Sequence, residues 1–412
     1  MIKAAKKHKA MFTPINLSQE LREKLPAWRH LGEEKVAPRN QQARCLVKNH
    51  NSERVKDLLK ITERLQNEYN RGLHKLDYTC QCEDCTNDKA NGCENPQRCA
   101  LEAKKRIQRI TPKLHPLRPP NSDNLTGPRT NNQGNRREEP TDEDESDDEE
   151  NPGITFDPSV TIKTDLTDCF RIFVDPNRVT NEPAMRQPPP RGIVIPDEKI
   201  TVYTDGSCLN NGKENAQCRG GIWFGEGSEH NCSLKVPSAD QSNQIGEIAA
   251  VIKALEITPN YVPLTIKSDS KYVIDGLTRH LTTWEDQGWI NVENKQWFKR
   301  AAYLLRRRTA KTKFKWVKGH SGELGNEMSD QLAKQGASKD TPDDISLEIP
   351  ARFDPQGAKL AKITQATAYK GILEQRHKEQ RRSTALILEK VRGDIEIQVG
   401  SQESDRAIWQ HI

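Results

Sequence analysis

The chain has 412 residues, of which 33% are hydrophobic and 30% charged, and its mean hydropathy is −0.88. This length predicts two or three domains, and this composition predicts that part of the chain lies outside any packed core. No stretch approaches the ~18 apolar residues of a membrane span, and no apolar segment follows the basic N-terminus as in a secretory signal. We therefore expect an intracellular protein of the nucleus or cytoplasm, neither secreted nor bound to a membrane. Ten cysteines, about 2.4% of the chain, are too few for a disulfide scaffold and suggest reduced thiols or metal ligands.

The charge is distributed unevenly along the chain. Residues 138–150 contain ten carboxylates and no Lys or Arg, so the rest of the chain carries +15 where the whole chain carries +5. A basic body with one acidic block favours a polyanionic partner, nucleic acid first. A solvated basic surface balanced by a solvated acidic linker is the alternative with the same composition.

Pattern and composition divide the chain into five parts. Apolar residues at three- and four-residue spacing predict helix over 41–75, and Pro, Asn and acidic residues dominate 112–155. From residue 200 onward, short apolar runs alternate with helical patterns, which is typical of a mixed α/β domain. In chain order we predict a poorly ordered N-terminus (1–40), a helical Cys-rich segment (41–111), an acidic and Pro-rich linker (112–198), an α/β domain (199–339) and a basic, partly helical tail (340–412).

Four carboxylates of the α/β domain lie where its predicted strands and helices begin or end: Asp205, Glu247, Asp269 and Asp330. Residues at the ends of neighbouring strands and at helix N-termini can converge on one point. Converging carboxylates repel one another unless a cation neutralises them, and a set of oxygen ligands selects Mg²⁺ or Mn²⁺. Two such ions can stabilise the attacking and leaving oxygens of phosphodiester hydrolysis.

A histidine accompanies the last of these carboxylates. His320 lies in the Gly-containing loop Lys318–Gly322, ten residues before Asp330. The glycines would let this loop carry the imidazole over a metal site, where it could take or relay a proton near neutral pH. Taken singly, each residue has an ordinary structural explanation as a turn, cap or solvated position, so the prediction depends on their combination.

Four segments carry a resemblance to a known family. YTDGS (203–207), NQIGEIAAV (243–251), SDSKYVIDGL (268–277) and VKGHSGELGNEMSDQLA (317–333) resemble type 1 ribonuclease H in order and approximate spacing, over about residues 198–339. The resemblance implies a five-stranded mixed sheet flanked by helices. It also implies endonucleolytic hydrolysis of the RNA strand of RNA–DNA hybrids, leaving 5′-phosphate and 3′-hydroxyl ends.

The same resemblance implies roles for the residues above. Asp205, Glu247, Asp269 and Asp330 match the carboxylates that bind two Mg²⁺ or Mn²⁺ ions, and His320 matches the histidine of the flexible catalytic loop. The carboxylates are then expected to be ionised, with no need for a raised pKa.

Seven further residues match positions where the family contacts its substrate: Asn211, Ser242, Asn243, Gln244, Tyr272, Trp284 and Asn294. The three residues Asn211, Asn243 and Gln244 match readers of the hybrid's minor groove, where amides can both donate to and accept from 2′-hydroxyls. The two aromatics match the DNA-strand channel, and Ser242 and Asn294 match the phosphate pocket. Core packing is the alternative for Trp284.

Departures from the family pattern predict weaker hybrid binding. The basic protrusion is short and has Glu285 and Asp286 in place of lysines, and Asp240 stands where an arginine often lines the phosphate pocket. The run 306–318, with seven basic residues and no acidic one, is the candidate compensating surface, although half of it is predicted to be a strand whose lysines alternate with core aromatics. Ser329 replaces the alanine that usually precedes the last aspartate.

Half of the cysteines fall within 20 residues: Cys80, Cys82, Cys85, Cys93 and Cys99, with His74 just upstream. Soft ligands at this density suit tetrahedral Zn²⁺. The spacing matches no standard zinc finger and leaves one cysteine over, so reduced thiols without metal are the alternative. The other five cysteines, including Cys45, are predicted to be packing residues.

The order of the segments resembles pieces of non-LTR retroelement polyproteins, which suggests a fragment or a copy retained by a host. The main hypothesis is an active, metal-dependent endonuclease whose partner is an RNA–DNA hybrid. The alternative is a nucleic-acid-binding, retroelement-derived protein in which the nuclease domain is weak or inactive.

Overall fold

The computed structural model describes residues 2–13, 15–33, 40–66, 74–117, 152–160, 162, 165–186, 190, 192, 199–211, 216–237, 241–377, 387 and 389–392. The acidic run 138–150 and Asp240 lie outside these residues. Within the described ranges, no helix combines the length and the apolar character needed to cross a membrane.

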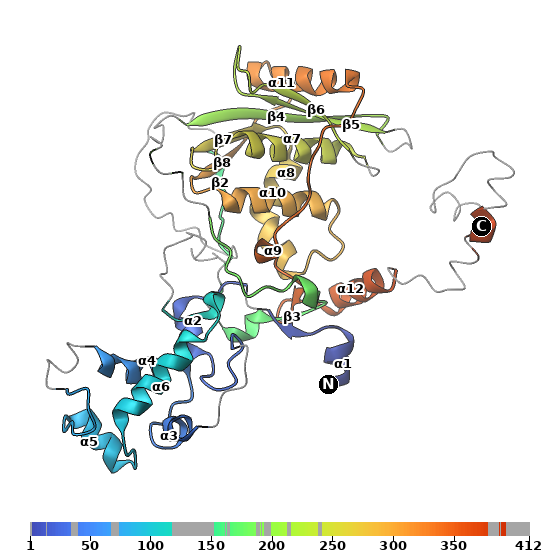
Figure 1. The fold of residues 1–412 in the computed structure, drawn as a ribbon. Coiled ribbons are helices and arrows are strands. Elements are labelled where there is room, and N and C mark those ends of the chain that lie inside the picture. Colours follow the sequence, from blue (N-terminus) through green and yellow to red (C-terminus); the bar gives the residue numbers. More distant parts are fainter. Residues whose placement is uncertain are drawn as a thin grey trace.

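A six-stranded mixed sheet forms the centre of the C-terminal half of the chain (Figure 1). Its strands, in spatial order, are β2 (Ile154–Thr155), β8 (Thr312–Trp316), β7 (Leu264–Ser268), β4 (Ile200–Leu209), β5 (Gln217–Trp223) and β6 (Cys232–Lys235). Strand β7 is parallel to both β4 and β8, whereas β5 is antiparallel to β4 and β6. The predicted five-stranded mixed sheet is therefore confirmed, and β2 extends it at the edge by pairing with β8.

Helices cover both faces of this sheet. On one face lie α7 (Asn243–Ile257), α8 (Lys271–Asp275) and α10 (Lys295–Arg307), and α11 (Leu324–Gln335) lies on the other (Figure 1). Two adjacent glycines of β5 mark the two faces: a Cβ on Gly220 would lie 3.1 Å from Ala250 of α7, and one on Gly221 only 1.9 Å from the backbone of α11. The helical patterns predicted from residue 200 onward correspond to α7, α8, α10 and α11.

Helix α7 is buried on more than one side. The residues Ile245–Ile252 are all buried, because the sheet covers one side of the helix and α10 packs on another. Between α8 and α10 the chain forms a π-helical turn (Gly276–His280) and α9 (Leu281–Asp286). The buried side chains of α7, α10 and the sheet form one continuous hydrophobic core.

A smaller helical body precedes this domain. It contains α3 (Gln41–Lys48), α4 (Val55–Thr62), α5 (Glu83–Ala90) and α6 (Pro96–Gln108), drawn in blue and cyan in Figure 1. The helix predicted over 41–75 is wrong as one element: α3 ends at Lys48, and α4 begins only after a turn that includes Asn51 at φ 48°. Residues 67–73 of that range lie outside the described residues. A small apolar core holds the helices together and includes Leu46, Leu58, Ala100, Ala103 and Ile107.

The prediction of a poorly ordered N-terminus is wrong for the described residues of 1–40. They form α1 (Ile2–Lys7), β1 (Met11–Phe12) and α2 (Gln19–Lys24), and the side chains of Leu17, Leu21 and Leu25 are at most 1% exposed. The charged residues between them dilute the apolar signal, so composition alone suggests disorder.

The predicted linker and tail also contribute ordered structure. Strand β3 (Phe170–Ile172) pairs with β1 on one side and with β9 (Ala358–Lys359) on the other, giving a second, antiparallel sheet. This second sheet thus brings together the N-terminal segment, part of 112–198 and part of 340–412, in three strands of two or three residues each. Strands this short carry no alternation that a sequence pattern can reveal. Helix α12 (Gln365–His377) follows in the tail.

Candidate active site

Three of the four predicted carboxylates converge. Asp205 lies within β4 opposite Gly221, Glu247 lies in the second turn of α7, and Asp269 directly follows β7. One carboxylate oxygen from each residue lies within 4.8 Å of the others. Parallel pairing of β4 with β7 places Asp205 and Asp269 at the same end of the sheet, and α7 brings Glu247 to them.

Glycines permit this convergence. A Cβ on Gly206 would lie 2.1 Å from the amide nitrogen of Glu247, and one on Gly246 would lie 2.5 Å from the carbonyl oxygen of Arg219. Only glycine allows α7 to approach the sheet this closely. This role was not predicted from the sequence, although both glycines stand directly beside a predicted carboxylate.

Burial and mutual repulsion dominate the electrostatics of the site. Asp205 is 8% exposed and Glu247 is 7% exposed. Burial raises the pKa of Asp205 to about 7, with a further contribution from the charge of Asp269, against a hydrogen bond of 2.7 Å from the Gly206 amide. Burial, then the charges of Asp205 and Asp269, raises the pKa of Glu247 well above its ordinary value. The expectation of ionised carboxylates with no raised pKa concerned the metal-bound site; for the chain by itself, burial and the neighbouring charges outweigh the Gly206 hydrogen bond and raise both pKa values.

The donor set fits a hard divalent cation. All three converging ligands are carboxylate oxygens, and the buried Oε2 atom of Glu247 has no hydrogen-bond partner. A buried oxygen without a partner is costly unless a cation or water satisfies it. Oxygen ligands of this kind suit Mg²⁺ or Mn²⁺.

Asp330 and His320 lie at the rim of this cluster. Asp330, on α11, is half-buried and forms an ion pair of 2.5 Å with Lys334, and it does not belong to the group of oxygens within 4.8 Å. Its charge still raises the pKa of Asp205, whereas His320 lowers it, so both side chains lie near Asp205. His320 is exposed and has a left-handed backbone (φ 52°). The preceding Gly319 passes so close that a Cβ would lie 2.6 Å from Asp269 Oδ2.

Five of the seven predicted substrate residues form two hydrogen-bonded groups around the start of α7. The amide N–H of Asn243 donates to Asn211 Oδ1 (3.3 Å), and both side chains are exposed. Asn294 Nδ2 donates to Gln244 Oε1 (3.3 Å) and to the Tyr272 hydroxyl (3.2 Å). These contacts join α7, α8 and the start of α10 into one polar surface.

The other two predicted substrate residues have evident structural roles. The Ser242 hydroxyl caps α7 by accepting from the Ile245 amide (3.4 Å). Trp284 is half-buried, with ring centroids 4.9 Å from Phe298, 5.8 Å from Trp289 and 5.6 Å from the stacked ring of His280. Trp284 thus packs against other aromatic rings over most of its surface, as the core-packing alternative predicts.

The basic run 306–318 does not form a continuous basic surface, which corrects the expectation of a compensating patch. Arg306 and Arg308 are each 2% exposed. Arg308 donates to Thr312 Oγ1 (2.9 Å) and to the carbonyl oxygens of Thr258 and Val262, so it ties the end of α10 to the loop after α7. Lys311 and Lys318 are exposed.

The cysteine cluster separates into two groups, each of three cysteines and one histidine. The first cluster is Cys45, His50, Cys93 and Cys99, and the second cluster is His74, Cys80, Cys82 and Cys85. Cys45, predicted to be a packing residue, does pack against the small apolar core, and it also belongs to the first cluster. Cys45 and His50 were missed because they lie more than 40 residues from Cys93 along the chain, although their own close spacing is a local signal.

Comparison with known proteins identifies the domain that carries the carboxylates. A family model for RNase H matches residues 197–338. Ribonuclease H of Schizosaccharomyces pombe is 37% identical over 154 residues, covering 36% of this chain and 56% of that protein. Human ribonuclease H1 is 35% identical over 145 residues, covering 34% of this chain and 50% of that protein.

A bacterial relative is matched over nearly its whole length. Ribonuclease H of Mannheimia succiniciproducens is 33% identical over 157 residues, which is 37% of this chain and 95% of that protein. The chain spans only about half the length of the two eukaryotic relatives. The range that the family model matches spans all four carboxylates and His320. With 33% identity over nearly the whole of the bacterial relative, the chain belongs to the ribonuclease H family.

Proposed function

We propose that residues 199–339 form an endonuclease that hydrolyses the RNA strand of RNA–DNA hybrids and leaves 5′-phosphate and 3′-hydroxyl ends. The observation that carries this proposal is the convergence of Asp205, Glu247 and Asp269 within 4.8 Å in a ribonuclease H domain. The names of the relatives support the reaction class. The three carboxylates would hold divalent metal, with Asp330 at the rim as a further ligand.

The metal supplies one part of the chemistry. When bound, two Mg²⁺ or Mn²⁺ ions stabilise charge on the phosphate and lower the pKa of a bound water. The chain contributes the rest of the site: His320, exposed on its loop, exchanges a proton with the departing 3′-oxygen or with water. The short distance between Gly319 and Asp269 keeps this loop beside the carboxylates.

Recognition of the hybrid is proposed for the polar surface around the start of α7. Asn211 and Asn243 expose amides there, and Gln244, Tyr272 and Asn294 are held by shared hydrogen bonds. Amides that are fixed in position can donate to and accept from 2′-hydroxyls, which distinguish an RNA strand from DNA. Contacts of this kind read the shape of the hybrid more than its base sequence.

Cleavage of a labelled hybrid tests the proposal. The full chain is incubated with an RNA–DNA hybrid labelled on the RNA strand, in Mg²⁺, in Mn²⁺ and in EDTA, beside single-stranded and double-stranded RNA. The expected result is cleavage of the hybrid's RNA strand only, lost in EDTA, with a 5′-phosphate on the downstream product. Asp269→Asn is expected to abolish cleavage and to retain binding of the hybrid.

Asp275→Asn is the matched control. Asp275 lies near Asp269 in the sequence but outside the group of converging carboxylates, and its half-buried side chain forms an ion pair of 3.1 Å with Arg279. This variant should cleave at the wild-type rate. The proposal would be contradicted by a folded wild-type protein that cleaves the hybrid in neither metal. If hybrid binding then disappeared on deletion of residues 1–111, the result would favour a binding protein with an inactive nuclease.

A further inference from the structure

The first cluster and the second cluster lie outside the nuclease domain, in the helical body formed by α3–α6. We infer that each cluster binds one structural zinc ion, so that the chain carries two Cys₃His zinc sites. The inference replaces the single tetrahedral site expected from the sequence, for which five cysteines were candidate ligands, and it is independent of the proposed nuclease activity. In each cluster, one ligand atom from every residue lies within 4.8 Å of the other three.

The ligand spacing within the clusters fits tetrahedral zinc. With Zn–S bonds of ~2.3 Å and Zn–N bonds of ~2.05 Å, neighbouring sulfurs lie about 3.8 Å apart, and a nitrogen lies about 3.5 Å from each sulfur. In the first cluster, the Sγ atoms of Cys93 and Cys99 are 3.7 Å apart. This distance is far too long for a disulfide, whose S–S bond is ~2.05 Å.

The second cluster has the same geometry around its histidine. His74 Nδ1 lies 3.3 Å from Cys82 Sγ, 3.4 Å from Cys80 Sγ and 3.6 Å from Cys85 Sγ. One ring nitrogen thus faces three sulfurs at nearly equal distances. Ordinary packing of a histidine gives no reason for such a set, whereas a shared metal ion does.

Each histidine is oriented by a partner on its other ring nitrogen, as histidine ligands of metal sites usually are. His50 Nδ1 lies 3.3 Å from Asp88 Oδ1, its side chain is 2% exposed, and the buried Nε2 has no hydrogen-bond partner. His74 uses the opposite nitrogen: the Gln97 side-chain amide contacts its Nε2, which leaves Nδ1 facing the thiols. In both clusters the imidazole offers a nitrogen to the group of sulfurs.

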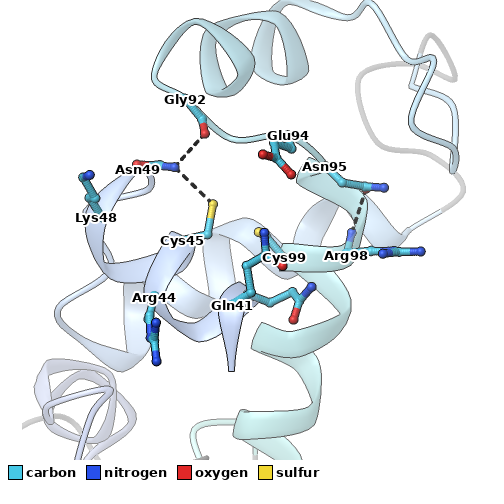
Figure 2. A pocket seen from close by; sticks show the side chains of 11 residues that line it. Gln41, Arg44, Cys45, Lys48, Asn49, Gly92, Glu94, Asn95, Arg98 and Cys99 are labelled. Carbon is cyan, nitrogen blue, oxygen red and sulfur yellow. Dashed lines mark hydrogen bonds between the residues drawn. The ribbon is translucent and has the colours of Figure 1, made fainter. Parts of the chain in front are cut away.

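Neighbouring N–H groups point at the sulfurs. The amide N–H of Lys75 donates to Cys80 Sγ (3.2 Å) in the second cluster. In the first cluster, Asn49 Nδ2 donates to Cys45 Sγ (3.3 Å) and to the Gly92 carbonyl oxygen (Figure 2). Donors of this kind stabilise a thiolate, which is the form that binds zinc. Cys45 and Cys99 line the pocket drawn in Figure 2. Its volume is about 260 Å³, and it would admit a metal ion to the first cluster.

The clusters also explain how this body holds together. Helix α5 has one buried residue, Cys85, so it lacks the apolar face that would otherwise attach it to its neighbours. The first cluster joins the end of α3 to the start of α6, and the second cluster lies within the loop that this junction closes. Zinc would therefore supply folding free energy that the small apolar core cannot.

Metal analysis of the full-length chain tests the inference. After purification without added chelator and a wash in Mg²⁺-free buffer, elemental analysis should give two zinc ions per chain. Cys85→Ser should leave one, and Cys93→Ser should leave no more than one. Cys232→Ser, which alters a half-buried cysteine of β6 outside both clusters, should leave two. Asp269→Asn should also leave two, which separates these sites from the metal of the proposed nuclease.

Cobalt substitution of the wild-type chain covers the case in which a serine variant fails to fold. Two equivalents of Co²⁺ should give the visible bands of tetrahedral cobalt with thiolate charge-transfer absorption, and zinc should displace both. A wild-type chain that holds fewer than two zinc ions after reconstitution would overturn the two-site inference. So would cobalt spectra without thiolate bands, or an unchanged zinc content in folded Cys85→Ser and Cys93→Ser.

Discussion

Arg306 on α10 donates two hydrogen bonds to the carboxylate of Glu285 on α9, with Nη1–Oε1 and Nη2–Oε2 distances of 2.5 Å and 3.0 Å. Both side chains are at most 3% exposed. The next residue, Asp286, pairs with Lys359 of β9 (3.0 Å) and with Arg171 of β3 (3.7 Å). The two acidic residues that replace the family's lysines therefore bind cations of the chain itself. Asp286 attaches the second sheet to the nuclease domain, whereas Glu285 pairs within that domain. Neither residue supplies the positive charge of a lysine, so weaker hybrid binding stays a prediction.

Breaking the Glu285–Arg306 pair should destabilise the protein strongly. Glu285→Gln leaves the Arg306 guanidinium buried without its counter-charge, which typically costs about 3–5 kcal/mol. Chemical denaturation followed by circular dichroism measures the effect. The double variant Glu285→Leu/Arg306→Met should recover most of the loss, because an apolar pair of similar size removes the unpaired charge. The pair Asp275–Arg279, whose side chains are 29% and 61% exposed, is the control, and Asp275→Asn should cost less than about 0.5 kcal/mol. A Glu285→Gln variant as stable as this control would contradict the structural role.

The buried carboxylates of the active site should lower stability when no metal is bound. Glu247 is 7% exposed and its pKa is raised by burial and by Asp205 and Asp269, so its ionised form is disfavoured in the folded state. Glu247→Gln removes the charge and should stabilise the protein in EDTA at pH 8 by about 1–3 kcal/mol, while hybrid cleavage is lost. Thermal melts in EDTA and in Mg²⁺ measure this. Mg²⁺ should raise the Tm of the wild type and have little effect on the variant, and a lower Tm for the variant in EDTA would contradict the prediction.

The sequence was informative where function depends on contiguous motifs. Asp205, Glu247 and Asp269 each lie beside a strong strand or helix pattern, so both their elements and their convergence could be predicted. The pairing of Asp286 with Arg171 and Lys359 could not, because it joins residues over 70 positions apart through strands too short to show alternation. Cys45 and His50 were missed for the same reason, since only the folded chain brings them to Cys93 and Cys99.

Close approach of α11 to β5 should make one glycine far less tolerant than its neighbour. A Cβ on Gly221 would lie 1.9 Å from Ser329 O and 2.5 Å from Ala333 N, so Gly221→Ala must displace α11, which carries Asp330. Gly220→Ala is the matched control on the same strand, with its nearest atom, Ala250 Cβ, at 3.1 Å. Overpacking typically costs about 1–3 kcal/mol, and we expect Gly221→Ala at or above that range with reduced cleavage. Denaturation and hybrid cleavage of both variants measure the difference, and equal losses at the two positions would contradict it.

Lys113 should give the stability a dependence on pH in the alkaline range. Its side chain is 6% exposed, its Nζ donates to the Thr180 carbonyl oxygen (3.1 Å), and burial lowers its pKa to about 8 from an ordinary value of 10.5. Between pH 8 and 10.5 the unfolded chain binds more protons at Lys113 than the folded chain, so its contribution to the free energy of unfolding rises with pH. At pH 7, keeping the buried ammonium of Lys113 charged lowers the free energy of unfolding by about 3 kcal/mol. Lys113→Met removes this cost but also loses the hydrogen bond to Thr180, which contributes about 1 kcal/mol. That variant should therefore be about 2 kcal/mol more stable than the wild type at pH 7, and the gap should close as the pH approaches 10.5. Urea denaturation of both proteins at several pH values isolates the effect of Lys113, because all other titrating groups are common to the two proteins. A difference in free energy of unfolding that stays constant or widens with pH would contradict the assignment.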